Sequence, residues 1–135
     1  MVAVHAITPI FYLSLLVRHI AQYLRNITYW VIFAHGKKKP HYALVDVQRV
    51  VEARGVNSFT ATALSGAAAL GLSHDQAVSV VLGLKPKDLF KSMTTHNDHK
   101  IWQDVYHASL DSGSVAYIKV TLRENGTVVI QFKEK

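Results

Sequence analysis

The chain has 135 residues, of which 50% are apolar and 18% are charged, and this size and composition predict one folded domain rather than a disordered tail. It contains no cysteine, which excludes disulfide scaffolds, thiol nucleophiles and cysteine-ligated zinc or iron–sulfur sites, so that a cytoplasmic location is expected. The net charge of +6 favours an anionic partner, most often nucleic acid or membrane phosphate.

Residues 1–35 differ in composition from the rest. They are strongly apolar, but Arg18 and Arg25 interrupt the run, and neither uninterrupted piece has the roughly 20 residues that a membrane span needs. Apolar residues recur three and four positions apart, as on one helical face: Leu13, Val17, Ile20, Leu24, Ile27 and Val31. Such an amphipathic helix can pack on a partner or lie on a membrane surface. We treat 1–35 as an N-terminal extension, with a misassigned upstream start as the alternative, and we expect no membrane association unless this extension is genuine.

Residues 36–90 predict a basic linker followed by helices. The linker is "GKKKPH", residues 36–41. Helical spacing and end signals predict helices over about 44–54, 60–70 and 73–82, and a short helix from Pro86 through Phe90. Ser73 and Gln76 have the S-x-x-Q spacing of a capping box, in which each side chain accepts a hydrogen bond from the other residue's backbone N–H.

After residue 90 the apolar period changes from 3.6 to 2, which indicates strands. We predict strands over 91–95, 101–110, 115–123 and 127–133. "DSGS" (111–114) predicts one turn, and "ENGT" (124–127) predicts a type I′ hairpin turn through its Asn-Gly pair. Helices followed by an antiparallel meander make an α+β fold, with the helices packed on one face of the sheet.

Alternation within the last two predicted strands places polar side chains together. One face carries Tyr117, Lys119, Gln131 and Lys133, while the apolar residues between them take the other. The strand over 101–110 is ambiguous, because polar and apolar residues occur on both of its faces. This polar face is either an ordinary solvated surface or a phosphodiester site. In the second case lysines would supply positive charge, and tyrosine and glutamine would supply hydrogen bonds.

Histidines offer two other chemistries. "HNDH" (96–99) has two imidazoles and a carboxylate, but it lies in a predicted loop with no third histidine at a matching spacing, and we expect no metal site there. His107 is a potential acid–base group near neutral pH if its strand directs it into the site. The sequence contains no phosphate-binding loop or Gly-rich nucleotide fingerprint.

Three stretches resemble one family. "VVLGLKPKDLF" (80–90), "LFKSMTTHNDHKIWQDVY" (89–106) and the C-terminal "FKEK" are similar to the MqsR family of type II toxins, over about residues 37–135. The resemblance implies a RelE-like fold, with 36–135 as the toxin domain. It also implies a ribosome-independent, metal-free endoribonuclease that cleaves single-stranded mRNA at short GC-containing sites. The expected partner is an MqsA-like antitoxin that inhibits the toxin and binds operator DNA, and no cofactor is expected.

The resemblance also implies roles for individual residues. The family's catalytic residues fall on Lys91, Gln103, Tyr117 and Lys133. Separately from the resemblance, we expect a second set to hold the RNA: Met93, His107, Lys119 and Arg123.

This chain departs from the family pattern at two positions. Phe90 stands where the family has tyrosine, and His107 stands where it has arginine. If that arginine aids phosphate binding, a neutral imidazole at this position would weaken it; the imidazole could instead take over a proton transfer. The alternative to an enzyme is therefore a catalytically inactive module that binds RNA or an antitoxin.

Overall fold

The computed structural model describes residues 17, 18, 20, 21 and 36–135. Gly36–Lys135 forms one compact unit, and the account below concerns this unit. Most of the amphipathic face predicted for residues 1–35 lies outside the described residues, although Val17 and Ile20 are helical and exposed. Among the described residues, no helix is long and apolar enough to cross a membrane.

Three α-helices come first in this unit. They are α2 (Leu44–Arg54), α3 (Ala61–Ala69) and α4 (His74–Leu82), with short 3₁₀ helices at Gly55–Ser58 and Pro86–Asp88. The capping box predicted for α4 is confirmed: Ser73 Oγ accepts from Gln76 N at 3.2 Å, and Gln76 Oε1 accepts from Ser73 N at 2.8 Å. The predicted helix through Phe90 is wrong, because the chain is already extended from Leu89.

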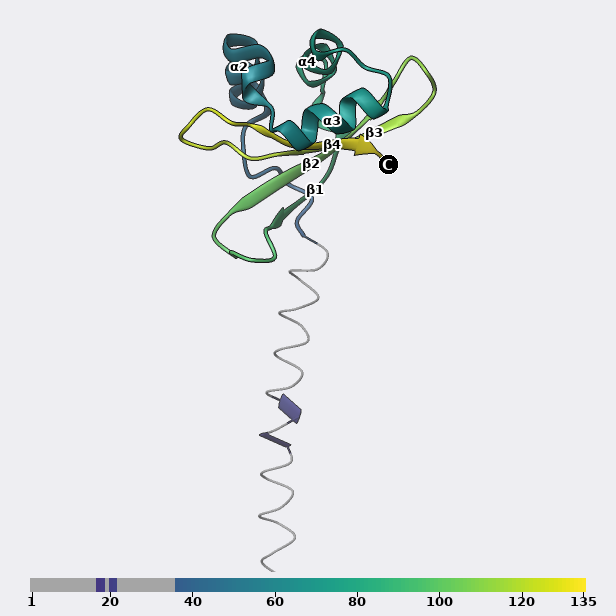
Figure 1. Cartoon of the computed structure of the whole chain (residues 1–135). Coiled ribbons are helices and arrows are strands. Elements are labelled where there is room, and N and C mark those ends of the chain that lie inside the picture. The colour runs from purple at the N-terminus through teal and green to yellow at the C-terminus, as the bar shows by residue number, and fades with distance from the viewer. Residues whose placement is uncertain (1–16, 19, 22–35) are drawn as a thin grey trace, which may run out of the picture. The chain divides into compact units, whose positions relative to one another are not determined.

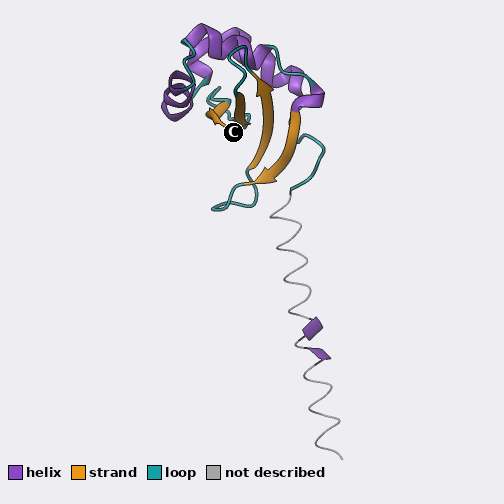
Figure 2. Cartoon of the chain, turned by 90° about the vertical axis from the view of Figure 1, so that its right-hand side faces the viewer, coloured by secondary structure: helices purple, strands orange, loops and turns teal. Residues whose placement is uncertain are grey.

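Four strands follow as an antiparallel meander. They are β1 (Leu89–Thr94), β2 (Trp102–Ser109), β3 (Val115–Val120) and β4 (Val129–Glu134), in the sheet order β1-β2-β3-β4. Figures 1 and 2 show the helices lying along one side of this sheet. The predicted α+β fold, with helices packed on one face of a C-terminal sheet, is confirmed.

The turn between β3 and β4 differs from the prediction. A type I′ turn needs a positive φ at both central residues, but within 36–135 only glycines have positive φ, among them Gly126 at 81°. Gly126 N donates to Arg123 O at 3.0 Å, and Arg123 N donates to Thr127 O at 3.2 Å. This is a type I turn followed by a left-handed glycine. Asn125 Oδ1 accepts a hydrogen bond from Thr127 N at 3.0 Å. The asparagine thus contributes to the turn through its side chain and not through a left-handed backbone conformation.

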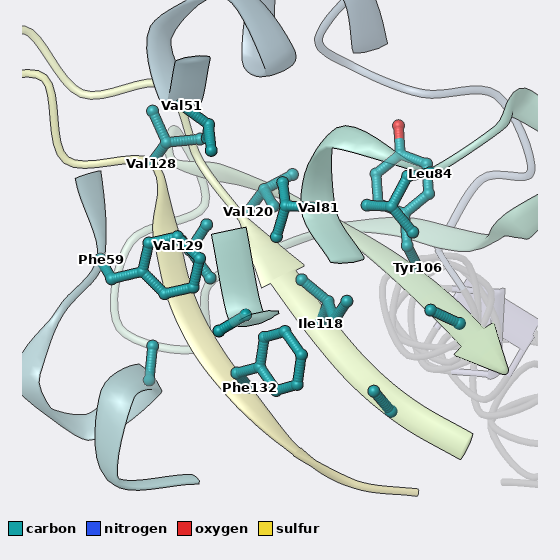
Figure 3. Packing of buried hydrophobic residues seen from close by; sticks show 14 of the residues in the cluster. Val51, Phe59, Val81, Leu84, Tyr106, Ile118, Val120, Val128, Val129 and Phe132 are labelled. Carbon is teal, nitrogen blue, oxygen red and sulfur yellow. The ribbon is translucent and has the colours of Figure 1, made fainter. Parts of the chain in front are cut away.

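The hydrophobic core fills the space between the helices and the sheet. Tyr106, Ile118 and Phe132 are fully buried there, and Figure 3 shows them with valines from the helices and strands. Helix α3 crosses β4 at Gly66, where a Cβ atom would lie only 1.6 Å from the carbonyl oxygen of Phe132. Because only a glycine allows this approach, the position of β4 depends on residue 66.

The segment predicted to be a basic linker is attached to the sheet instead. Lys37 N donates to Ser92 O at 2.8 Å, and Ser92 N donates to Lys37 O at 2.7 Å, so that Lys37 forms a β-bridge on the outer edge of β1. Local sequence could not predict this pairing, because its partner lies more than fifty residues further along the chain.

Candidate active site

The register of the sheet determines which side chains share a face. Directly paired residues of antiparallel strands point to the same side. Tyr117 pairs with His107 on β2 and with Lys133 on β4, while Lys119 pairs with Val105 and Gln131. On β1, Lys91 pairs with Val105 and Met93 with Gln103. We call the side opposite the helices the open face; its positions are Lys91, Met93, Gln103, Val105, His107, Tyr117, Lys119, Gln131 and Lys133.

The open face therefore carries all four residues expected to be catalytic and three of the four expected to hold RNA. The ambiguity of the strand over 101–110 is resolved, because Gln103 and His107 lie on the open face and Tyr106 lies in the core. Arg123 is the exception. It lies beyond the end of β3, in the turn to β4, and its side chain is exposed.

Tyr117 is at the centre of a close group. The Nζ atoms of Lys133 and Lys119 lie 5.2 and 6.0 Å from the centre of its ring, and the His107 ring lies 5.9 Å away. Burial raises the pKa of Tyr117 above its ordinary value. The phenol is therefore protonated at neutral pH and can donate a hydrogen bond to an anionic oxygen.

Lysines give the open face its charge. Burial, followed by the positive charges of Lys133 and Lys91, lowers the pKa of Lys119. This repulsion indicates that the ammonium groups of Lys91, Lys119 and Lys133 lie close enough to act on the same bound group. A bound anion would reduce the repulsion among them. None of the nine positions of the open face carries a carboxylate. Val105 is fully buried on this face, which we attribute to the alkyl stems of Lys91 and Lys119 on the strands beside it.

Gln103 and Met93 lie at the other end of the open face. Gln103 is four residues along β2 from His107, which is about 13 Å at the usual rise of a strand. The structure therefore brings together Lys91, Lys119, Tyr117 and Lys133, and it places Gln103 beside Met93, at a distance from Tyr117. The two ends are therefore separate positions of the open face.

The sequence identifies Phe90 as a departure from the family pattern, but it does not predict how Phe90 reaches the site. The pairing of β1 with β2 shifts between Leu89 and Lys91, and the irregularity leaves Phe90 as an extra residue. Its ring stacks on His107 at 4.3 Å with an interplanar angle of 19°, and Lys91 Nζ lies 5.4 Å from its centre. The side chain remains 48% exposed. Simple alternation would have directed Phe90 into the core, and only a shift in register reveals its place.

His107 is placed to act as a neutral imidazole. Burial, and then the positive charge of Lys135, lower its pKa below the ordinary value. Its two ring neighbours are Phe90 and Tyr117, which together form an aromatic row across three strands. A neutral ring cannot replace the fixed charge of an arginine, but it can accept or donate a proton.

The described residues contain no group of three histidine, cysteine, aspartate or glutamate side chains that could hold a metal ion. The "HNDH" segment lies in the loop between β1 and β2. There Thr95 Oγ1 donates to Asp98 O at 2.7 Å, and Asp98 Oδ1 accepts from Lys100 N at 2.8 Å. Asp98 thus stabilises the turn.

Comparison with known proteins identifies the family. Residues 39–134 match the family described as "Motility quorum-sensing regulator, toxin of MqsA". The chain belongs to the MqsR toxin family. It is 43% identical over 99 residues to the mRNA interferase toxin MqsR of Escherichia coli (strain K12), an alignment that covers 73% of this chain and 98% of that protein. The family drawn from the K-S-M-T-T, I-W-Q-D-V and F-K-E-K stretches is confirmed. Each of these stretches contributes side chains to the open face: Lys91 and Met93, Gln103 and Val105, and Lys133.

Proposed function

We propose that this chain is the toxin of a type II toxin–antitoxin pair and that its open face cleaves single-stranded mRNA. The observation that carries the proposal is the placement of Lys91, Tyr117 and Lys133, with Lys119, on one exposed sheet face of an MqsR-family chain. The named function of the Escherichia coli relative supports the same activity. The proposed location of this activity is the cytoplasm, where mRNA is available.

The reaction that fits this face uses the 2′-hydroxyl of the substrate as nucleophile. Its oxygen attacks the neighbouring phosphorus while the bond from phosphorus to the 5′-oxygen breaks, leaving a 2′,3′-cyclic phosphate and a 5′-hydroxyl. One proton leaves the 2′-hydroxyl and one reaches the departing oxygen. Negative charge builds up on the non-bridging phosphate oxygens, and preorganised cations and hydrogen-bond donors stabilise it.

Lys91, Lys119 and Lys133 surround the place where this charge develops. Tyr117 has the ammonium groups of Lys119 and Lys133 close to its ring, and it donates its phenolic hydrogen to a phosphate oxygen or to the leaving oxygen. The lowered pKa of Lys119 makes it the lysine best suited to exchange a proton. His107 is the second candidate for that exchange, because it is next to Tyr117 and its pKa is lowered as well.

Gln103 and Met93 then hold a neighbouring nucleotide. Gln103 lies about 13 Å along β2 from His107, and Met93 is paired with Gln103, which separates both from the reacting phosphate. Their amide and thioether groups suit a base edge and a base face. Phe90 offers an exposed ring for stacking at the opposite end. The specificity that we propose for the open face is cleavage at short GC-containing sites.

The inhibitory partner proposed for this toxin is an MqsA-like antitoxin that also binds operator DNA. The family description supports it by naming the members as toxins of MqsA. Binding of the antitoxin is expected to abolish cleavage by the purified chain.

The proposal is tested by growth and by cleavage. Expression of the full chain is expected to arrest growth, and Tyr117→Phe and Lys91→Ala are each expected to lower cleavage about 10²–10³-fold, the usual cost of removing one transition-state donor. Lys87→Ala is the matched control, because Lys87 is an exposed lysine outside the open face. Full activity in folded Tyr117→Phe protein would refute the site. RNA that is bound without being cut by the wild-type chain would favour the non-catalytic module instead.

A further inference from the structure

Residues 37–42 hold a fixed position at the edge of the sheet. The backbone of Lys37 is paired with Ser92 on β1. Asp104, which is fully buried on β2, accepts from His41 N at 2.9 Å and from Tyr42 N at 2.9 Å. Three backbone anchors within six residues therefore fix this segment, although its side chains at 37–41 are exposed.

At the same edge, the side chain of Lys37 is held by an aromatic side chain. Lys37 Nζ lies 4.2 Å from the centre of the Trp102 ring, and the His41 ring stacks on Trp102 at 4.9 Å with an interplanar angle of 7°. A cation held over an indole has lost part of its freedom before any ligand arrives. We call the exposed residues Lys37, Lys38, Lys39 and His41 the edge patch.

The edge patch is unusual in its charge. Residues 46–135 carry ten lysines and arginines against nine aspartates and glutamates, so that this part of the chain is nearly neutral. Residues 1–45 contain no acidic residue. Three consecutive lysines on an ordered backbone thus form a local concentration of positive charge with no acidic residue beside it in the sequence, and such a charge attracts an anionic chain.

The location of the edge patch suggests which anionic chain it binds. Ser92, the partner of Lys37, stands between Lys91 and Met93, which both point to the open face. Neighbouring strands lie about 5 Å apart, so the backbone of Lys37 is one strand spacing from the end of the open face that carries Met93 and Gln103. Lys37 shares the side of Ser92, and Trp102 shares the side of Thr94, which is the side opposite the open face. An RNA strand that leaves the open face past Met93 therefore reaches the edge patch by passing around the outer edge of β1.

We propose that Lys37–Lys39 and His41 form a second RNA-backbone site, which holds the substrate outside the nucleotides at the cleavage point. The inference rests on the proposed RNA cleavage, and it adds a subsite that determines how much flanking RNA the toxin grips. Lysines bind phosphate without reading sequence, so the edge patch increases affinity for longer RNA and leaves the cleavage sequence to the open face.

The test compares RNA of two lengths. The full chain and the double variant Lys38→Ala/Lys39→Ala are titrated with 2′-O-methylated RNA, which lacks the nucleophile and is not cut. One oligonucleotide of about four nucleotides covers the open face alone, and one of about twelve also reaches the edge patch, within the range of known single-strand site sizes. Lys38 and Lys39 are chosen because Lys37 also contacts Trp102. The matched control is Lys85→Ala/Lys87→Ala, which removes two exposed lysines beside α4.

The double variant is expected to weaken binding of the longer RNA about tenfold and to reduce the slope of log K against log salt by about 1.4, at about 0.7 for each lost phosphate contact. Binding of the short RNA stays unchanged, and the Lys85/Lys87 control keeps both the affinity and the slope. Equal affinities of the double variant and the wild-type chain for the longer RNA would overturn the proposal. An equal loss in the control would also overturn it, because the effect would then be one of net charge.

Different outcomes of this test would contradict the proposed function and the edge patch. If the wild-type chain bound neither RNA, both the cleavage site and the edge patch would be contradicted. If it bound and cut RNA while the double variant behaved as wild type on both lengths, only the edge patch would be wrong. Loss of binding to anionic vesicles with unchanged binding to RNA would assign the patch to a lipid surface instead.

Discussion

Replacing Gly66 with alanine tests how the fold positions the active face. The new Cβ atom would lie 1.6 Å from the carbonyl oxygen of Phe132, whereas favourable contacts between heavy atoms begin at about 3.5 Å. Helix α3 and β4 would have to separate by about 2 Å. Both sides of this contact are backbone, so no side chain can rotate away, and we place the cost at about 3 kcal/mol, the upper end for overpacking.

The same substitution has an opposing effect. Alanine in place of glycine inside a helix stabilises by up to about 1 kcal/mol, which leaves a net loss of about 2 kcal/mol in the free energy of unfolding. A urea titration of Gly66→Ala measures it as a lower midpoint with an unchanged m-value. Ser65→Ala is the control, because Ser65 is exposed on the same helix and its change should leave stability within about 0.5 kcal/mol.

Gly66→Ala is also expected to affect catalysis, because the residue after Phe132 belongs to the proposed active site. Lys133 is the next residue on β4, and its Nζ lies 5.2 Å from the ring of Tyr117. Displacing β4 would move Lys133 away from Tyr117, so Gly66→Ala is expected to lose RNA cleavage even at temperatures where it remains folded. A Gly66→Ala protein as stable and as active as wild type would refute the close approach of α3 and β4.

Three further predictions concern charged groups. Because the folded-state pKa of His107 is lowered, the unfolded chain binds the proton more readily, and the free energy of unfolding is expected to fall as pH drops below about 6.5. Between pH 7.5 and 5.5, the urea midpoint of His107→Gln should therefore fall less than that of the wild-type chain. An equal fall would exclude His107 as the cause. Lys133→Met is expected to raise the pKa of Lys119, measured by NMR titration of the lysine side chain, since it removes one of the repelling charges; an unchanged pKa would show that the two ammonium groups do not interact. Asp104→Ala leaves two backbone N–H groups without their acceptor and is expected to cost about 2–4 kcal/mol in thermal or urea unfolding; a loss below about 0.5 kcal/mol would mean that the carboxylate does not anchor the segment.

Features that depend on short-range interactions were predictable from sequence. The capping box of Ser73 and Gln76 involves residues three positions apart, and both of its hydrogen bonds are present. Tyr117 and Lys119 reach the open face because β3 alternates regularly, with buried residues at each intervening position. Period and end signals were also enough for the order of helices and strands.

Features that depend on register or on distant partners were not predictable. Phe90 reaches the site through an irregularity in the pairing of β1, which no alternation rule contains. Asn125 keeps a negative φ because its own side chain accepts from Thr127 N, so the turn type was wrong although the turn itself was placed correctly. Lys37 is ordered by Ser92 and Trp102, and the tract around it looked like a linker only because those partners are remote.

The chemistry of the cleaved ends tests the central claim most directly. The full chain is incubated with a single-stranded mRNA, and the products are examined for their terminal groups. Attack by the 2′-hydroxyl on a face of lysines and a tyrosine predicts discrete cuts with 5′-hydroxyl and 2′,3′-cyclic phosphate ends, which form about 10²–10³-fold more slowly with Tyr117→Phe. Fragments that carry 5′-phosphates, or intact RNA after prolonged incubation with folded protein, would contradict it.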